Sequence, residues 1–389
     1  MEHITFLVAV VIITALAFDF TNGFHDTANA MATSIATGAL RPKVAVAIAG
    51  VLNLAGAFLS VEVAKTISGG IIDESSGVRP QVVFAALIGA ILWNLVTWLR
   101  GIPSSSSHAL YGGLIGATLV AVGMHGVKFD VVVTKILIPA VASPIVAGVA
   151  AWAATKVAYR ITAKGGTATN AKGFKAGQIA SASLVSLAHG TNDAQKTMGV
   201  ITLTLVSAGA VAPHSSPPTW VIVSSGLAIA IGTYLGGWRI IRTLGKGITE
   251  IEAPQGFAAQ TASAAVILTS SHMGYGLSTT QVCSGGIMGA GKAGRTGEVH
   301  WSTARRMAYA WGLTLPAAAL LGGAGAVLSD RGGWGVAALA AIGIGLSTWI
   351  YLVSRRKPVD AGTVLEVAAD DTVTPLDPAA TTPAAPVAA

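Results

Sequence analysis

The chain has 389 residues, of which 52% are hydrophobic and 11% are charged. Soluble domains carry roughly 25% charged residues, so this composition excludes an ordinary soluble protein. The formal net charge of +7 does not indicate nucleic-acid binding, because the basic residues stand in short loops between apolar runs, where they orient membrane spans. The single cysteine, Cys283, excludes an internal disulfide framework and a CxxC metal site.

Apolar runs long enough to cross a bilayer, which takes about 17–25 helical residues, occur along the whole chain. They lie at residues 4–21, 44–66, 82–99, 131–159, 219–237, 257–274, 304–328 and 334–354. Gly, Ser, Thr and Asn interrupt four further apolar segments, at residues 22–40, 104–123, 190–212 and 276–291. We expect these four to be broken or re-entrant helices, because irregular backbone is tolerated at membrane depth where it lines a cavity. The sequence thus predicts an all-α membrane protein with about 10–12 spans, including broken or re-entrant helices.

Two motifs occur twice in the chain. The stretch Gly23–Ala30 recurs as Gly190–Thr197, with an offset of 167 positions. The stretch Ser105–His108, which precedes a Gly-rich segment, recurs as Ser278–Gln281, with an offset of 173 positions. Because each copy sets a carboxylate and hydroxyl groups in apolar surroundings, the duplication predicts one central polar site shared by two halves of a membrane transporter.

Loop charge predicts how the two copies cross the membrane. The loop at residues 41–43 is basic, whereas its counterpart at 213–218 is uncharged. The loop at 73–74 is acidic, whereas its counterpart at 239–242 is basic. Under the positive-inside rule, corresponding loops therefore lie on opposite sides of the membrane, which predicts an inverted-topology repeat. Chance loop charge is the alternative, because short loops offer few charges to count.

The predicted domain organisation has five parts. These are a first repeat at residues 1–162, a cytoplasmic linker at 163–176, a second, inverted repeat at 177–330, a last transmembrane span at 331–357 and a disordered tail at 358–389. The tail consists largely of Pro, Ala, Thr and Asp without apolar periodicity, so it cannot bury a core. The many spans predict a multi-pass protein of the cell membrane.

Asp26 and Asp193 are the carboxylates of the duplicated motif. An ionised carboxylate at the bilayer centre costs about 2.5–3.5 kcal/mol on insertion scales, so each needs polar partners. A helix brings His25 and Asn29 to the Asp26 side, and it places Lys196 at i+3 from Asp193. A private Asp193–Lys196 ion pair is the alternative to a shared site. We assign Asp26, Asn29, Asp193 and His25 to cation coupling, and Asp26 and Asp193 to metal binding.

Other intramembrane polar residues receive simpler interpretations. Asp19 and Glu62 have no counterpart of the same kind in the other copy, and we interpret them as interface or span-end groups. We interpret His189 and His272 as packing groups within spans.

Hydroxyl clusters at Ser104–Ser107 and Ser278–Thr280 each precede a helix of small residues with GxxxG spacing. Hydroxyl and unpaired N–H groups at a helix start form a donor nest suited to a tetrahedral oxyanion. Helix capping and interhelical hydrogen bonding are the alternatives for either cluster alone. The residues that we assign to substrate binding are Ser105, Ser106, Ser107, Asn192, Lys196, Ser278, Thr279, Thr280 and Gln281.

Four ordered motifs resemble the signature elements of the PiT family of inorganic phosphate transporters, especially its bacterial low-affinity branch. They are Asn22–Ala30, Pro103–His108, Ala188–Lys196 and Leu277–Gln281, and the resemblance covers about residues 4–354. It implies an inverted-repeat transporter that carries inorganic phosphate with a cation, and not an enzyme.

Two positions differ from the sodium-coupled members of that family, which have Gly-Ala-Asn-Asp-type motifs in both copies. Here His25 replaces the first Asn, and Lys196 stands where the first copy has Asn29. This pattern resembles that of bacterial relatives, which implies proton coupling and uptake of phosphate as a neutral complex with magnesium or another divalent metal. We predict import of inorganic phosphate with protons and no resident cofactor. Sodium-coupled phosphate symport, and transport of sulfate or another tetrahedral oxyanion, are the alternatives.

The expected partners are inorganic phosphate and membrane lipid, with a second copy of the chain as a further candidate and no nucleic acid. An intramembrane serine hydrolase using Ser104–Ser107, His108 and Asp26 is disfavoured, because the chain has no Gly-x-Ser-x-Gly elbow and has Gln281 in place of the histidine in the second copy. A passive anion channel is a third alternative, and transport that does not depend on a cation would support it.

Overall fold

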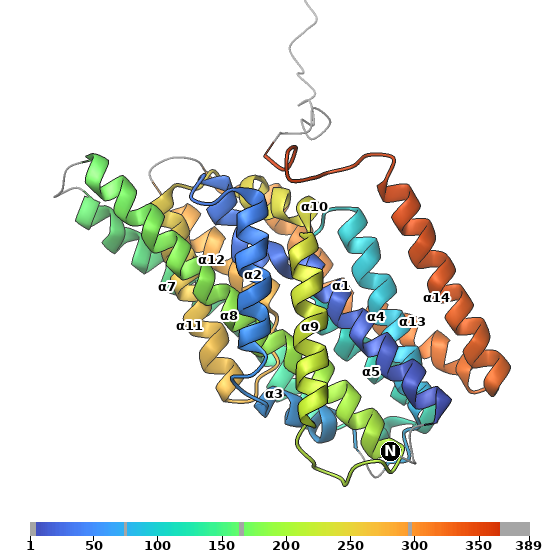
Figure 1. Ribbon diagram of the computed structural model, residues 1–389. Coiled ribbons are helices and arrows are strands. Elements are labelled where there is room, and N and C mark those ends of the chain that lie inside the picture. The colour runs from blue at the N-terminus through green and yellow to red at the C-terminus, as the bar shows by residue number, and fades with distance from the viewer. Residues whose placement is uncertain (1–4, 74–75, 163–166, 295–297, 366–389) are drawn as a thin grey trace, which may run out of the picture.

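The computed structural model describes residues 5–73, 76–162, 167–294 and 298–365, which are almost entirely helical (Figure 1). The elements of the first half are α1 (Phe6–Ala36), α2 (Pro42–Gly56), α3 (Glu62–Lys65), η1 (Thr66–Ile71), α4 (Pro80–Leu99), α5 (Ser106–Val122), η3 (Met124–Gly126), α6 (Phe129–Val131), η4 (Val132–Leu137) and α7 (Ile138–Thr162). Those of the second half are α8 (Thr167–Ser207), α9 (Thr219–Leu235), α10 (Trp238–Arg242), η5 (Thr243–Gly247), α11 (Ala253–His272), α12 (Thr279–Ala293) and α13 (Trp301–Ser329), followed by α14 (Gly333–Ser354).

The order of elements in the first half recurs in the second. A long helix (α1 or α8) is followed by a shorter one (α2 or α9), a short helix with a π-helical turn, a helix of 20 residues (α4 or α11), a serine-capped helix (α5 or α12) and a long helix with an internal proline (α7 or α13). Contacts between the halves follow the same correspondence, because α5 packs on α13 as α12 packs on α7, and α1 packs on α9 as α8 packs on α2. Figure 1 shows α1 and α8 running in opposite directions.

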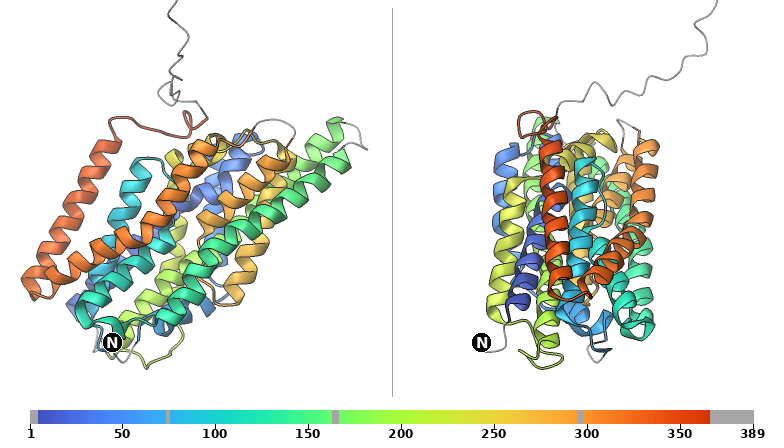
Figure 2. Two further views of the ribbon diagram at one scale, coloured as in Figure 1. Left: turned by 180° about the vertical axis from the view of Figure 1, so that it is seen from behind. Right: turned by 90° about the vertical axis from the view of Figure 1, so that its right-hand side faces the viewer.

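Five of the described helical segments are long and apolar enough to cross a membrane. They are Phe6–Ala36, Pro80–Leu99, Phe129–Ile161, Trp301–Ser329 and Gly333–Ser354. The pair Thr219–Leu235 and Trp238–Gly247, bent by 62°, would make a sixth if it forms one span. The predicted 10–12 spans also count shorter and broken segments, so that number stays a prediction. The helix α14 packs on α4 at the edge of the bundle in Figure 1 and in the left-hand view of Figure 2, and it faces the viewer in the right-hand view.

Two of the four interrupted segments are not broken, contrary to expectation. Residues 22–36 belong to the continuous helix α1, and residues 190–207 belong to the continuous helix α8. Gly23 and Gly190 stay helical because neighbouring backbone lies against them: a Cβ at Gly23 would come 2.4 Å from the Ile229 carbonyl oxygen. The other two segments form the short helices α5 and α12, whose first turns are buried in the bundle.

Small residues bring these two short helices against the long proline-containing ones. A Cβ built at Gly116 of α5 would lie 2.0 Å from the Ala319 carbonyl oxygen of α13. A Cβ at Gly289 of α12 would lie 2.0 Å from the Gly148 carbonyl oxygen of α7. Glycine lets membrane helices approach this closely, so the glycines of the GxxxG pairs hold α5 against α13 and α12 against α7.

Two of the predicted segment boundaries differ from the structure. The helix α8 starts at Thr167, inside the predicted linker, and residues 163–166 lie outside the described residues. In the predicted disordered tail, Val364 is buried in an apolar cluster, and Lys246 Nζ donates to the Leu365 carbonyl at 2.7 Å. The prediction from composition missed these two apolar residues, because the rest of the tail is polar or rich in Pro and Ala. Residues 366–389 lie outside the described residues.

Candidate functional site

The duplicated motifs meet in the centre of the bundle. The helix α1 provides Asp26 and α8 provides Asp193, and both carboxylates are buried. The first turns of α5 and α12 provide the hydroxyls of Ser106, Ser107, Thr279 and Thr280, which are also buried. The structure therefore brings together the carboxylates and hydroxyls that the sequence repeat predicts to share one site.

Neutral hydroxyls and a histidine surround Asp26. Its Oδ1 accepts from Ser106 Oγ at 3.3 Å and from Thr280 Oγ1 at 3.2 Å. The Nδ1 atom of His25 lies 2.6 Å from the same oxygen. On the other side of its ring, His25 Nε2 lies 3.3 Å from Thr97 Oγ1. No lysine or arginine forms an ion pair with this carboxylate among the described residues, and His25 is its direct ion-pair partner.

A lysine neutralises Asp193. The buried Lys196 ammonium donates to Asp193 Oδ1, to Ser107 Oγ at 2.5 Å and to the Leu277 carbonyl at 3.1 Å. The other carboxylate oxygen, Oδ2, accepts from Thr279 Oγ1 at 3.1 Å. The Asp193–Lys196 ion pair is thus not private, because Lys196 also binds α5 and the segment before α12.

The hydroxyl contacts follow the repeat. Ser106 and its counterpart Thr279 each donate to the carboxylate of their own half. Thr280 donates to the carboxylate of the other half, and its counterpart Ser107 accepts from Lys196 of the other half. Asn29, the counterpart of Lys196, completes this pattern by donating to Thr279 at 3.3 Å and Thr280 at 3.1 Å.

Helix capping uses a different pair of hydroxyls. Ser105 Oγ accepts from the backbone N–H of His108 at 3.1 Å, and Ser278 Oγ accepts from that of Gln281 at 3.3 Å. The capping alternative therefore describes Ser105 and Ser278, whereas the next residues point into the site: Ser106, Thr279 and Thr280 donate to the carboxylates, and Ser107 accepts from Lys196. Both short helices direct their N-termini at the central site, and a helix N-terminus favours an anion.

The side chains of Asn192 and Gln281 form no hydrogen bond with the carboxylates among the described residues. Asn192 Nδ2 donates to Ser271 Oγ at 2.8 Å and to the Tyr275 carbonyl at 3.3 Å, both at the end of α11 or just after it. The Gln281 side chain is buried, and its Oε1 has no hydrogen-bond partner. Their assignment to substrate binding stays a prediction.

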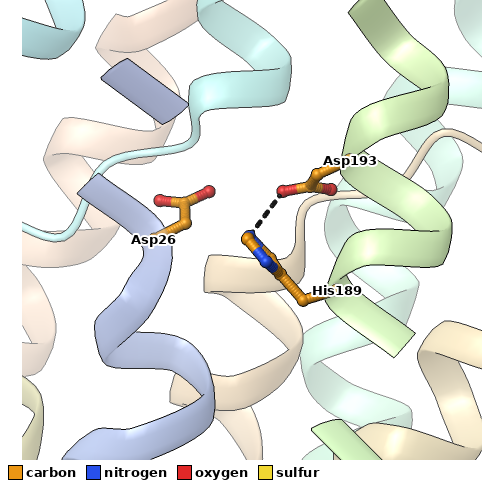
Figure 3. Close-up of side chains that lie close together, drawn as sticks. All are labelled: Asp26, His189 and Asp193. Carbon is orange, nitrogen blue, oxygen red and sulfur yellow. Dashed lines mark ion pairs between the residues drawn. The ribbon is translucent and has the colours of Figure 1, made fainter. Parts of the chain in front are cut away.

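His189 is a site residue that the sequence analysis placed among packing groups. Its Nε2 lies 3.0 Å from Asp193 Oδ2, and Figure 3 shows the Asp26 carboxylate reaching toward the same pair from α1. The signal was present in the sequence, because His189 precedes Asp193 by four residues and therefore shares its helix face. The repeat also pairs His189 with Asn22 and His25 with Asn192, so each copy has one histidine and one asparagine at these two positions.

Asp26, His189 and Asp193 could hold a metal ion together. One ligand atom from each lies within 4.8 Å of the others. Ligands on opposite sides of an octahedral Mg²⁺ are about 4 Å apart, so small side-chain rotations would bring all three within binding distance. With neutral histidines, the two carboxylates and Lys196 leave one net negative charge, which favours a cation at this centre.

A buried polar centre between two corresponding halves of an apolar helical bundle defines a membrane transporter with a midplane site. The chain belongs to the phosphate transporter family: the model described as "Phosphate transporter family" matches residues 22–322. It is accordingly a phosphate transporter, a multi-pass protein of the cell membrane and not an enzyme, which removes the serine hydrolase alternative.

Individual relatives agree with this assignment. The chain is 57% identical over 358 residues to a protein of Mycobacterium tuberculosis H37Rv named "Probable low-affinity inorganic phosphate transporter", covering 91% of this chain and 86% of the relative. It is 42% identical to a Bacillus subtilis protein of the same name, covering 83% of this chain and 97% of the relative. A solved structure named "The sodium-dependent phosphate transporter" has a TM-score of 0.73 at 24% identity, covering 82% of this chain and 98% of that one, and shows the shared fold.

Proposed function

We propose that this chain is a secondary active transporter that imports inorganic phosphate with protons, and that it accepts phosphate as a complex with a divalent metal. The observation that carries the proposal is the asymmetric pair of carboxylates, of which Asp193 is neutralised by Lys196 and Asp26 is faced by a histidine and hydroxyls. The centre thus offers a fixed cation for an anion and a second position for a mobile cation.

The membrane potential makes a co-transported cation necessary. Moving one charge across 100 mV is worth about 2.3 kcal/mol, so a hydrogen-phosphate dianion entering a negative-inside cell meets roughly 4–5 kcal/mol before any concentration gradient. A divalent metal bound to phosphate cancels its charge, and protons then supply the driving force. His25 is suited to hold such a proton, because its Nδ1 lies 2.6 Å from the Asp26 carboxylate.

Each group has a role in this proposal. The phosphate oxygens accept hydrogen bonds from Ser106, Thr279 and Lys196. In the structure, the two hydroxyls donate to the carboxylates, and Lys196 donates to Ser107. The metal of the complex binds between Asp26 and Asp193, and His189 provides a nitrogen ligand. Carboxylate and water suit magnesium and manganese, whereas an imidazole suits zinc and nickel, so the histidine broadens the range of metals that can accompany phosphate.

Alternating access follows from the two halves. We propose that they form an inverted-topology repeat, supported by the recurring element order, the exchanged contacts and the opposite directions of α1 and α8. In such transporters one bundle rocks against the other around a fixed midplane site. The boundary between the repeats stays near residues 163–176.

Sodium-coupled phosphate symport is the second candidate, supported by the name of the solved structure with the same fold, which describes a sodium-dependent transporter. Lys196 argues against a sodium ion next to Asp193, because two like charges at 4 Å cost about 4 kcal/mol at an effective dielectric constant of 20. Sulfate shares the tetrahedral geometry of phosphate, and the family assignment favours phosphate over it.

Uptake of labelled phosphate into proteoliposomes, with pH, sodium and magnesium varied separately, tests the proposal. We expect uptake to follow an inward proton gradient, to collapse with a protonophore, to increase with magnesium and to be indifferent to replacing sodium by choline. Steep sodium dependence without a response to the protonophore would contradict proton coupling and leave phosphate transport intact.

A further inference from the structure

Asp19 is a fully buried carboxylate outside the contacts described above. It belongs to α1, and its hydrogen-bonding neighbours are the side chains of Asn22 from α1 and Thr197 from α8. No partner of ordinary hydrogen-bond geometry reaches either Asp19 oxygen, Asn22 Oδ1 or Thr197 Oγ1. Buried polar atoms nearly always have a partner, so four unpartnered oxygens in one place require an explanation.

The repeat shows that packing does not require this carboxylate. With the offset of the Asp26 motif, the counterpart of Asp19 in α8 is Ser186, whose Oγ donates to the Ala182 carbonyl at 3.0 Å. The second half therefore fills the same position with a neutral side chain that satisfies its own hydrogen bond. The interpretation of Asp19 as a span-end group is wrong, because it lies well inside the 31-residue helix α1.

Asp19 is on the same helical stripe as the central site. Asn22 and Asp26 follow it at i+3 and i+7, which places Asp19 about 10 Å from Asp26 along the helix axis. Under the orientation predicted from loop charge, the start of α1 faces the outside, so a cation entering from there meets Asp19 before Asp26. Intramembrane carboxylates in such positions form proton relays in transporters.

We propose that Asp19 binds a co-transported proton on the outer side of the phosphate site, an inference that rests on the proposed proton-coupled function. The carboxylate takes up one proton from outside and becomes a neutral acid, with Asn22 Oδ1 as the acceptor of its hydrogen bond. It releases the same proton to the inside when the transporter opens there. The charged groups that act on it from other helices are Asp193 and Lys196, both in α8, and α4 and α9 contain no charged residue.

The number of ligands favours a proton over a metal ion. Three side chains provide four unpartnered oxygens here, whereas Mg²⁺ takes six ligands and Ca²⁺ six to eight. A proton needs one carboxylate and one acceptor. The neutral Thr197 hydroxyl can donate to the carboxylate in its charged form, which lets the site exist in both protonation states.

The test compares Asp19→Asn with wild type and with Ser186→Ala, the matched control in the second half, in proteoliposomes. Phosphate exchange at equal pH on both sides measures substrate movement without net proton transfer, and steady-state accumulation under an imposed pH gradient measures coupling. Each coupled proton raises the attainable accumulation ratio about tenfold per pH unit of gradient. We expect Asp19→Asn to keep phosphate exchange but to lower phosphate accumulation about tenfold at a gradient of one pH unit. The same variant should lower the proton-to-phosphate ratio by one. Ser186→Ala should match wild type in all three measurements.

Wild-type accumulation and stoichiometry in Asp19→Asn would overturn the inference and leave the proposed function standing. Absence of proton-driven uptake in wild type would overturn both. If Asp19→Asn does not fold, Asp19→Glu replaces it in the test. We expect the longer acid to retain the proton-to-phosphate stoichiometry. It should also shift a titrating carboxyl band in infrared difference spectra of the full chain. A spectrum with no titrating band that responds to this substitution would overturn the inference.

Discussion

The two sides of the central site share a framework and differ in charge. Asp26 accepts from hydroxyls at the starts of both α5 and α12, and Asp193 accepts from one at the start of α12, in an arrangement related by the repeat. Asp193 also has a permanent ammonium, whereas the equivalent position on the other side is the neutral Asn29. Duplication thus fixed where polar groups meet, and divergence of single residues gave Asp193 a permanent counter-ion that Asp26 lacks.

The largest expected effect comes from removing either carboxylate. Asp26→Asn and Asp193→Asn should both abolish coupled phosphate uptake in proteoliposomes while the protein remains inserted. Their effects on stability should differ: loss of one partner of a buried ion pair costs about 3–5 kcal/mol, so Asp193→Asn should lower thermal stability and Asp26→Asn should not.

A double variant provides the control for that difference. Asp193→Asn combined with Lys196→Asn removes both charges, and it should recover most of the thermal stability without recovering uptake. Wild-type accumulation by both single variants would contradict the two-carboxylate site, and equal destabilisation by them would contradict the assigned asymmetry.

Lys196→Asn tests the same asymmetry by making the second side resemble the first. The variant loses a charge-assisted hydrogen bond to phosphate, worth about 1.5–3 kcal/mol, so the KM for phosphate should rise roughly 12–140-fold. Removal of the fixed charge should also let sodium stimulate uptake. An unchanged KM, measured with labelled phosphate at saturating magnesium, would show that Lys196 acts only as a counter-ion.

The sequence could predict that Asp26 and the hydroxyl clusters share one site, because both motifs recur in the same order in the two halves of the chain. It could not tell which hydroxyls cap a helix, because Ser105 and Ser106 differ only in where the helix begins. The spacing placed His189 on the helix face of Asp193, but it could not show that Asp26 of α1 lies beside the same pair. The continuity of α1 and α8 was missed because Gly and polar residues weaken a helix in water, whereas close backbone packing retains it here.

A smaller effect is expected for the hydroxyls that contact the charged centre. Ser106→Ala and its counterpart Thr279→Ala each remove one hydrogen bond, worth about 0.5–1.5 kcal/mol, so the KM for phosphate should rise roughly 2–12-fold. Because the two positions correspond in the repeat, their effects should be similar in size. A large effect at one of them alone would place phosphate on that side of the site only.

The smallest effect on transport is expected for Ser105→Ala, next to Ser106 in the same helix start. Ser105 accepts the His108 N–H, and replacing an N-cap serine by alanine typically costs about 1 kcal/mol of stability. Its hydroxyl contributes no hydrogen bond to either carboxylate among the described residues, so the KM should change less than in Ser106→Ala while thermal stability falls more. A KM that rises more in Ser105→Ala than in Ser106→Ala would mean that phosphate binds at the helix cap itself. The anion site would then be the backbone N–H groups of the first turn of α5, rather than the side chains that face Asp26.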